Sequence, residues 1–190
     1  MPAMPTPDGD SAKTASTTEV PFGPEDSMLV LCLSLVIVLC DQLTKFWVMR
    51  FLPDEGIAVV SGWFHFRRVH NTGAAWGVFE GFSDGLILLS IVMLALIIVF
   101  RRSFLLDRVV HKLAMGAMIG GIIGNLIDRV RLGYVVDFLD FYRGDSHFPA
   151  FNIADSAICV GVFLYIIVQF LPVRAKPSPV GEPRGGGGGV

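Results

Sequence analysis

The sequence predicts an all-α integral membrane protein with four transmembrane helices and a small extracytoplasmic β-element between helices one and two. Of its 190 residues, 53% are hydrophobic and only 17% are charged, and the mean hydropathy is +0.62. A soluble domain of this size needs more charge to cover its surface. In addition, about four apolar stretches are long enough to cross roughly 30 Å of hydrocarbon as helices. Both observations indicate a membrane protein.

The chain divides into three parts. Residues 1–26 are rich in Pro, Thr, Ser, Ala and acidic residues without a periodic apolar pattern, which predicts a disordered tail. They are not expected to be a secretory signal, because no basic region and short apolar core precede a cleavage-like site. Residues 27–173 form the predicted membrane domain. Residues 174–190 end in a run of glycines and predict a flexible tail.

The predicted spans cover residues 28–50, 85–100, 109–127 and 154–171. Basic residues gather between spans two and three and after span four, at Arg101, Arg102, Arg108, Lys112, Arg174, Lys176 and Arg184. Cytoplasmic loops carry such an excess, so both termini are expected in the cytoplasm. Residues 51–84 and 128–153 are then the outer loops. The outer loops also carry arginines, so the charge bias is partial.

The first outer loop contains the aromatic-rich segment GWFHFRRVHN at 62–71. This composition predicts a small strand pair lying at the membrane surface. Trp63, Phe64 and Phe66 would supply apolar contact, and Arg67 and Arg68 would face the lipid headgroups.

Small residues line one side of the third span. Gly116, Gly120 and Gly124 recur every four residues and give a smooth helix face that a neighbouring helix can approach closely. Asp128 is the next member of this series, at the outer end of the face. A residue marking the membrane border and a functional group explain Asp128 equally well.

Asp41 lies inside the first span, where a carboxylate costs on the order of 3 kcal/mol. Lys45 follows one helical turn later, and an i,i+4 ion pair would offset part of that cost. The pair is explained either as a structural feature or as a polar group that serves an internal site.

Two further acids lie near the start of the fourth span. Asn152 is a suitable N-cap, which places Asp155 in the first helical turn, where the helix dipole alone would favour an acid. Asp137 is flanked on both sides by apolar residues, unlike an acid in an ordinary surface loop. Asp140, three residues later, is expected to be the solvated member.

Together, Asp128, Asp137 and Asp155 fall at one membrane face. Two carboxylates a few ångströms apart do not both ionise easily and share a proton, so they titrate as a unit. One can take a proton from water while the other donates to a carbonyl oxygen or leaving amine. This pattern is typical of an aspartic hydrolase. Because the pair titrates as a unit, the sequence does not assign the proton to either aspartate, although helix-end stabilisation of Asp155 favours Asp137 as its carrier.

The sequence offers few residue patterns for other kinds of catalysis or binding. His65, His70, His111 and His147 show no zinc-type spacing, so neither a metal nor a cofactor is expected. The net charge of −2 does not suggest a nucleic-acid partner. A proton- or ion-coupled transporter and a non-catalytic membrane scaffold remain alternatives, since intramembrane acids and glycine faces also occur in those classes.

Three segments resemble the lipoprotein signal peptidase (signal peptidase II) family: GNLIDR at 124–129, VVDF at 135–138 and FNIADS at 151–156. DQLTK at 41–45 and NTGAAWG at 71–77 look like the two earlier motifs of the family. The resemblance covers roughly residues 28–172. Trp76 stands where the family more often has Phe, which is a conservative aromatic change.

The resemblance implies a membrane aspartic endopeptidase of the bacterial cytoplasmic membrane, active near its outer face among membrane lipids. It would remove signal peptides from prolipoproteins by cutting before a diacylglyceryl-modified cysteine, and globomycin-type peptides would inhibit it. By motif match, Asp137 and Asp155 would form the catalytic dyad. Supporting or substrate-binding roles would fall to Asp41, Lys45, Asn71, Asn125, Asp128, Arg129 and Asn152.

Overall fold

A computed structural model of the chain describes residues 24–73, 78–101 and 109–170. Nearly all of the N-terminal tail and the whole of the predicted C-terminal tail lie outside the described residues, as does Trp76 in the NTGAAWG segment. The first helix begins at Pro24, slightly before the predicted start of the membrane domain.

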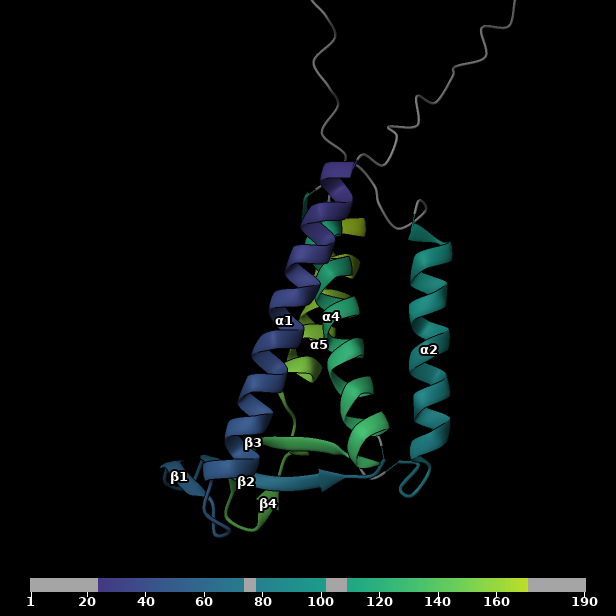
Figure 1. The fold of residues 1–190 in the computed structure, drawn as a ribbon. Helices are drawn as coiled ribbons and strands as arrows, with labels where there is room; N and C mark the ends of the chain where they lie inside the picture. Colours follow the sequence, from purple (N-terminus) through teal and green to yellow (C-terminus); the bar gives the residue numbers. More distant parts are fainter. Residues whose placement is uncertain (1–23, 74–77, 102–108, 171–190) are drawn as a thin grey trace, which may run out of the picture.

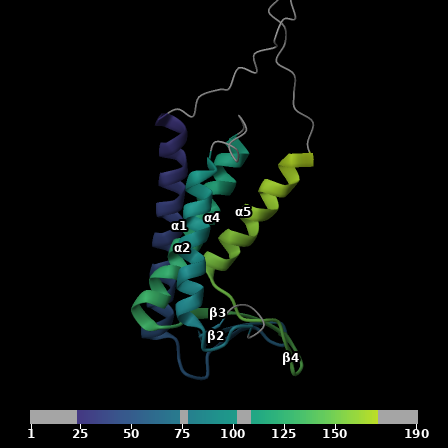
Figure 2. The ribbon, with the colours of Figure 1, turned by 90° about the vertical axis from the view of Figure 1, so that its right-hand side faces the viewer.

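Four long helices make up most of the described chain: α1 (Pro24–Phe51), α2 (Ser83–Val99), α4 (Val109–Leu132) and α5 (Ile153–Phe170). α1, α4 and α5 pack together, and α2 stands beside α4 at the edge of the group (Figure 1). Seen from the side, α5 diverges from α1 and α4 with distance from the sheet (Figure 2). Three helices, α1, α4 and α5, are long and apolar enough to cross a membrane, whereas α2, with 17 residues, is shorter.

The end of α4 differs from the prediction, because the helix continues to Leu132 instead of ending at residue 127. Asp128 and Arg129 therefore lie on a helix and not in an outer loop. Arg129 and Arg131 occupy the last turn, where cations interact favourably with the helix dipole. Gly133 ends the helix with a φ of 80°, and its N–H donates to the Arg129 carbonyl at 3.0 Å.

The β-element is larger than predicted. β1 (Ile57–Val60) and β2 (Phe64–Asn71) form the expected pair, but β3 (Val135–Arg143) and β4 (Ser146–His147) extend it to an antiparallel sheet in the order β1-β2-β3-β4. The fold is thus mostly helical with a four-stranded sheet at one end of the bundle, drawn from both loops (Figure 1). β3 was not predicted from the sequence, because its first residues are buried and lack the polar–apolar alternation of a half-exposed strand.

The glycine face of α4 packs against α1, as predicted. A methyl group at Gly116 would lie 3.1 Å from the Val30 carbonyl oxygen, and one at Gly120 would lie 2.9 Å from that of Ser34. A second face meets α5, where a methyl group on Gly121 would lie 2.4 Å from the Ala154 carbonyl oxygen. Close backbone approach on two sides makes α4 the central helix.

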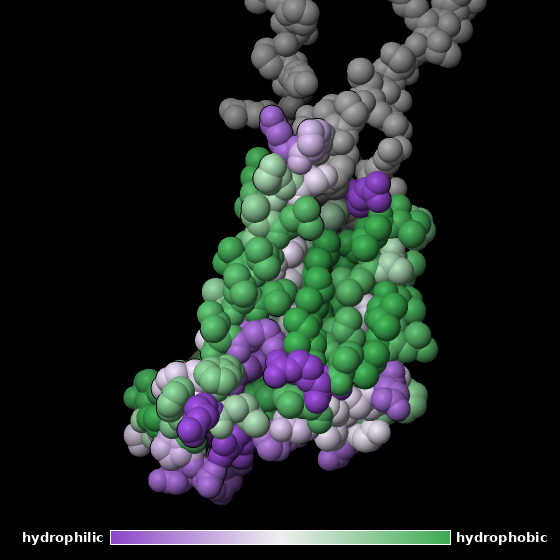
Figure 3. Space-filling view, viewed as in Figure 1, coloured by the Kyte–Doolittle hydropathy of each residue, from purple (hydrophilic) through white to green (hydrophobic). Residues whose placement is uncertain are grey.

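A small apolar cluster joins the end of α1 to the sheet. Val48 and Leu52 of α1 pack against Val136 and Phe138 of β3, and all four are buried. Since Val136 and Phe138 flank Asp137, this cluster fixes the strand that carries it. Elsewhere the helices expose a broad apolar band, while polar residues gather at the sheet end (Figure 3).

Candidate active site

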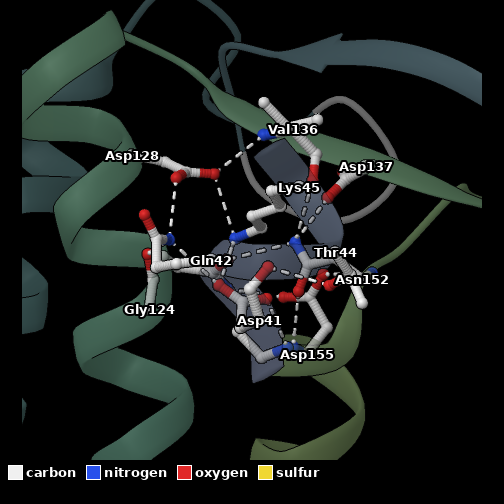
Figure 4. A network of polar contacts seen from close by, with 12 residues as sticks. Asp41, Gln42, Thr44, Lys45, Gly124, Asp128, Val136, Asp137, Asn152 and Asp155 are labelled. Carbon is white, nitrogen blue, oxygen red and sulfur yellow. Dashed lines mark hydrogen bonds and ion pairs between the residues drawn. The ribbon is translucent and has the colours of Figure 1, made fainter. Parts of the chain in front are cut away.

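A buried ammonium group ties α1 to α4. Lys45 Nζ lies 2.8 Å from Asp41 Oδ2, 3.0 Å from Asp128 Oδ2 and 3.0 Å from Asn125 Oδ1 (Figure 4). The predicted Asp41–Lys45 pair is therefore present. Lys45 has three N–H donors, and these three contacts use all of them.

Asp41 and Asp128 also fix backbone outside their own helices. Asp41 Oδ1 accepts the N–H of Ala154 at 2.9 Å, which ties α1 to the first turn of α5. Asp128 Oδ2 accepts the N–H of Val136 at 3.1 Å, which ties α4 to β3. Both carboxylates thus hold the two elements that carry Asp155 and Asp137.

Gln42 belongs to the same cluster, and the sequence reasoning missed it. Its Nε2 donates to Asp41 Oδ2 at 3.2 Å, to Asp128 Oδ1 at 3.0 Å and to the Gly124 carbonyl at 3.2 Å. Its position inside the DQLTK segment was the available signal, because a polar residue beside an intramembrane acid needs partners as well.

The predicted N-cap of α5 is present and reciprocal. Asp155 N–H donates to Asn152 Oδ1 at 2.9 Å, and Asn152 N–H donates to Asp155 Oδ2 at 3.1 Å. This capping box satisfies two backbone donors at the helix start and fixes the Asp155 carboxylate relative to Asn152.

Two amide side chains hold Asp137. Asn152 Nδ2 donates to Asp137 Oδ1 at 2.7 Å, and Asn71 Nδ2 donates to Asp137 Oδ2 at 2.8 Å. In Figure 4, Asn152 lies between Asp137 and Asp155. One asparagine therefore contacts both carboxylates, which come from β3 and α5.

Asn125 connects the charged cluster to Asp155. Its Oδ1 accepts from Lys45 and also from Asn152 Nδ2 at 3.1 Å. With the carbonyl oxygen occupied in this way, the Nδ2 group is turned towards Asp155 Oδ1, to which it donates at 2.7 Å. Lys45 thus determines which end of the Asn125 amide faces Asp155.

The pKa of Asp137 is raised to about 7, chiefly because the carboxyl is buried and also because of the negative charge of Asp155. Hydrogen bonds from Asn71 and Asn152 and the charge of Lys45 favour the ionised form, but they do not outweigh the raising effects. Asp137 therefore keeps its proton to a higher pH than an ordinary aspartate.

Asp137 and Asp155 line a cavity of about 610 Å³. Asn71, Asn125 and Arg129 line it as well, and apolar residues of α2, α4 and α5 form much of the remaining wall: Leu86, Leu89, Met93, Ile122 and Ile158. Arg129 Nη2 donates to the Gly73 carbonyl at 3.2 Å, and its buried Nε has no partner among the described residues.

All nine residues that the sequence predicted for the site lie in this network or on the cavity wall. Asp140, which was not one of the nine, lies outside it. The expectation that Asp140 is solvated is wrong, because its side chain is 0% exposed and faces His147 and Arg67. Within the described ranges, no three His, Cys, Asp or Glu side chains are grouped so that they could hold a metal ion.

Comparisons with known proteins agree on one family. The sequence model described as Signal peptidase (SPase) II matches residues 33–171. The lipoprotein signal peptidase of Syntrophotalea carbinolica is 40% identical over 146 residues, covering 75% of this chain and 91% of that protein. The lipoprotein signal peptidase of Nitratidesulfovibrio vulgaris is 41% identical over 157 residues, covering 80% of this chain and 92% of that protein.

Two solved structures, both described as a bacterial membrane enzyme, share the fold. One, at 2.3 Å resolution, superimposes with a TM-score of 0.68 at 29% identity and covers 77% of this chain and 94% of its own. The other, at 1.9 Å, gives 0.65 at 30% identity and covers 74% and 92%. The chain belongs to the signal peptidase II family of membrane peptidases.

Proposed function

We propose that this protein is an aspartic endopeptidase that removes signal peptides from prolipoproteins, cutting before the diacylglyceryl-modified cysteine. Asp137 and Asp155 form its catalytic dyad. The observation that carries the proposal is that Asn152 bonds to both of these carboxylates while both line one cavity.

The two carboxylates differ in a way that suits acid–base catalysis. Asp137, with its pKa of about 7, retains its proton to a higher pH than an ordinary aspartate. Both carboxylates accept two hydrogen bonds, but only Asp155 lies in the first turn of a helix, where the dipole of α5 favours the ionised form. Asp155 is therefore the base, and Asp137 is the acid.

The reaction needs one water and no cofactor. Asp155 takes a proton from water as the oxygen attacks the scissile carbonyl carbon, and Asp137 gives its proton to the carbonyl oxygen. When the C–N bond breaks, Asp155 returns its proton to the leaving amine. Asp137 then recovers a proton from the intermediate's hydroxyl group, which restores both side chains.

Polar groups around the dyad hold the substrate. Arg129 lines the cavity, and its guanidinium group can donate to a peptide carbonyl of the substrate. Asn71 and Asn125 hold the dyad aspartates, and Asp41, Lys45 and Asp128 support them through the buried ammonium cluster.

The surroundings of the dyad fit a substrate anchored in lipid. The cavity wall is mostly apolar along α2, and the dyad lies at the sheet end of the bundle, on β3 and in the first turn of α5. Acyl chains on the cysteine would hold the scissile bond at this depth among membrane lipids, so modest peptide contacts suffice. Globomycin-type peptides would occupy the same cavity as inhibitors.

α2 completes a four-span topology in the bacterial inner membrane. At about 1.5 Å per residue, its 17 residues span about 25 Å, close to the hydrocarbon thickness. With four spans, both termini lie in the cytoplasm and the sheet, together with the active site, lies at the outer face.

Cleavage of a synthetic diacylglyceryl precursor peptide by the purified protein tests the proposal. The parent protein is expected to release the signal peptide, and Asp137→Asn and Asp155→Asn are each expected to lower kcat by at least about a thousandfold, because acid and base act as a unit. Asp84→Asn, on α2 and outside the cavity wall, is the matched control and should retain activity. Cleavage that survives both dyad substitutions would refute the mechanism.

A further inference from the structure

Asp140 lies on β3 outside the dyad network, yet its carboxylate is fully buried. Its two oxygens lie 2.9 Å and 3.0 Å from His147 Nδ1, and Oδ2 lies 3.3 Å from Arg67 Nε and 3.9 Å from His65 Nδ1. A buried carboxylate is costly unless it is paired. The buried Asp140 carboxylate is therefore stabilised by the side chains of His147, Arg67 and His65.

His147 is the group held most closely. A carboxylate only accepts hydrogen bonds, so Nδ1 of His147 carries a proton and donates it to Asp140. The His147 ring also stacks on Tyr142, with centroids 5.3 Å apart and planes at 13°. Although 39% of its side chain is exposed, His147 is fixed on two sides.

The chain that follows His147 forms part of the cavity wall. Residues 148–151, the wall segment, all line the cavity and lead directly into Asn152 and the start of α5. The Phe148 N–H donates to the Phe141 carbonyl at 2.8 Å, and Phe151 exchanges hydrogen bonds with Leu139 at 2.9 Å and 3.1 Å. The contacts of the His147 side chain with Asp140 and Tyr142, called the anchor below, hold the start of the wall segment at the end of β4.

We propose that Asp140 and His147 are positioning residues for precursor binding, which hold the wall segment against the bound peptide without touching the reacting atoms. The inference rests on the proposed peptidase function. Asp137 and Asp155 are held by Asn71, Asn125 and Asn152, none of which contacts Asp140 or His147 among the described residues. Loss of the anchor therefore changes binding more than chemistry.

Steady-state kinetics with the lipidated precursor separate these two effects. His147→Ala is expected to raise KM about tenfold, the usual effect of losing a hydrogen bond to a charged group, with kcat within about twofold. His147→Asn keeps a donor at the place of Nδ1 and should restore KM to within about threefold of the parent value. Asp140→Asn places an amide donor against Arg67 and should raise KM as His147→Ala does.

Asp145→Asn is the matched control, because Asp145 is an exposed acid on the same β3–β4 hairpin. It should leave both constants unchanged. A fall in kcat at constant KM in His147→Ala, or a His147→Asn variant that behaves like His147→Ala, would overturn the proposal. An equal KM rise in Asp145→Asn would overturn it as well.

Hydrogen exchange without substrate tests the anchor independently of catalysis. In His147→Ala the amides of residues 148 and 151, which bond to Phe141 and Leu139, should exchange at least about tenfold faster, while those of α5 keep their protection. Unchanged exchange would refute the anchoring role even if the parent protein cleaves precursor. Failure of the parent to cleave would instead refute the proposed function. If His147→Ala does not fold, Asp140→Asn and His147→Asn carry both measurements.

Discussion

The proton on Asp137 determines the expected pH dependence of catalysis. Asp137 must be protonated to act as the acid, and its pKa is about 7. Above that pH the proton is lost, so kcat/KM is expected to fall about tenfold per pH unit between roughly pH 7.5 and 9. A pH profile of kcat/KM with the lipidated precursor measures this alkaline limb.

Asn71→Ala tests the same assignment by changing the pKa of Asp137. The Asn71 amide donates to the ionised carboxylate and so lowers the pKa of Asp137; its removal should move the alkaline limb to higher pH. Thr72→Ala, one residue further on, should leave the limb in place. An alkaline limb that does not move in Asn71→Ala would contradict the assignment of Asp137 as the acid.

The raised pKa of Asp137 also makes the free energy of unfolding depend on pH. The folded state binds the Asp137 proton more tightly than the unfolded chain, whose ordinary pKa is about 4. Between about pH 4 and pH 7 the folded state therefore carries more protons, so the contribution of this carboxyl to the free energy of unfolding falls as the pH rises through that window.

Individual residues were predictable where a single physical cost marked them. Asp41 stood out because a lone carboxylate inside an apolar span requires a partner, and Lys45 was the partner within reach. Asp140 was misjudged because its partners, His147 and Arg67, come from other strands, whose pairing local spacing does not reveal.

At the scale of elements, one buried cation joins α1 to α4. Lys45→Met would leave Asp41 and Asp128 facing each other without a counter-charge, and we expect the free energy of unfolding to fall by about 3–5 kcal/mol. Thermal unfolding in detergent measures the loss. Adding Asp128→Asn should recover part of it, because the remaining charge repulsion is removed. Strict additivity of the two substitutions would contradict the coupling.

The α4–α5 contact depends on the absence of a side chain. A methyl group on Gly121 would lie 2.4 Å from the Ala154 carbonyl oxygen, and backbone cannot yield cheaply. Gly121→Ala is expected to destabilise the protein by about 3 kcal/mol and to lower kcat, since Ala154 adjoins Asp155. Val130→Ala, at an exposed position on the same helix, should change the free energy of unfolding by less than about 0.5 kcal/mol.

Helix existence followed from apolar length, but the sheet did not follow from local pattern. Aromatic-rich composition predicted a strand pair in the first loop, whereas the start of β3 is buried continuously and packs against the end of α1. The extension of α4 past residue 127 depends on Asp128 bonding to Lys45 and Val136, which are tertiary partners.

At the scale of the whole molecule, the proposed four-span arrangement predicts which side each segment faces. In a background with the native cysteines replaced, Asp145→Cys should react with a membrane-impermeant maleimide in intact spheroplasts. Ser11→Cys should react only after permeabilisation. Labelling of both positions from outside would require an even number of spans between them and would remove α2 from the membrane.

The hydrogen bond between Asp41 and the Ala154 N–H joins positions 113 residues apart. Because Asp41 already has its ammonium partner four residues away on α1, this helix can enter the lipid as an electrically compensated segment while the rest of the chain is still being synthesised. The arrival of α5 then supplies the last donor. The order of synthesis thus matches the order in which the charges acquire their partners, and the position of Asp155 is fixed only when the final helix arrives.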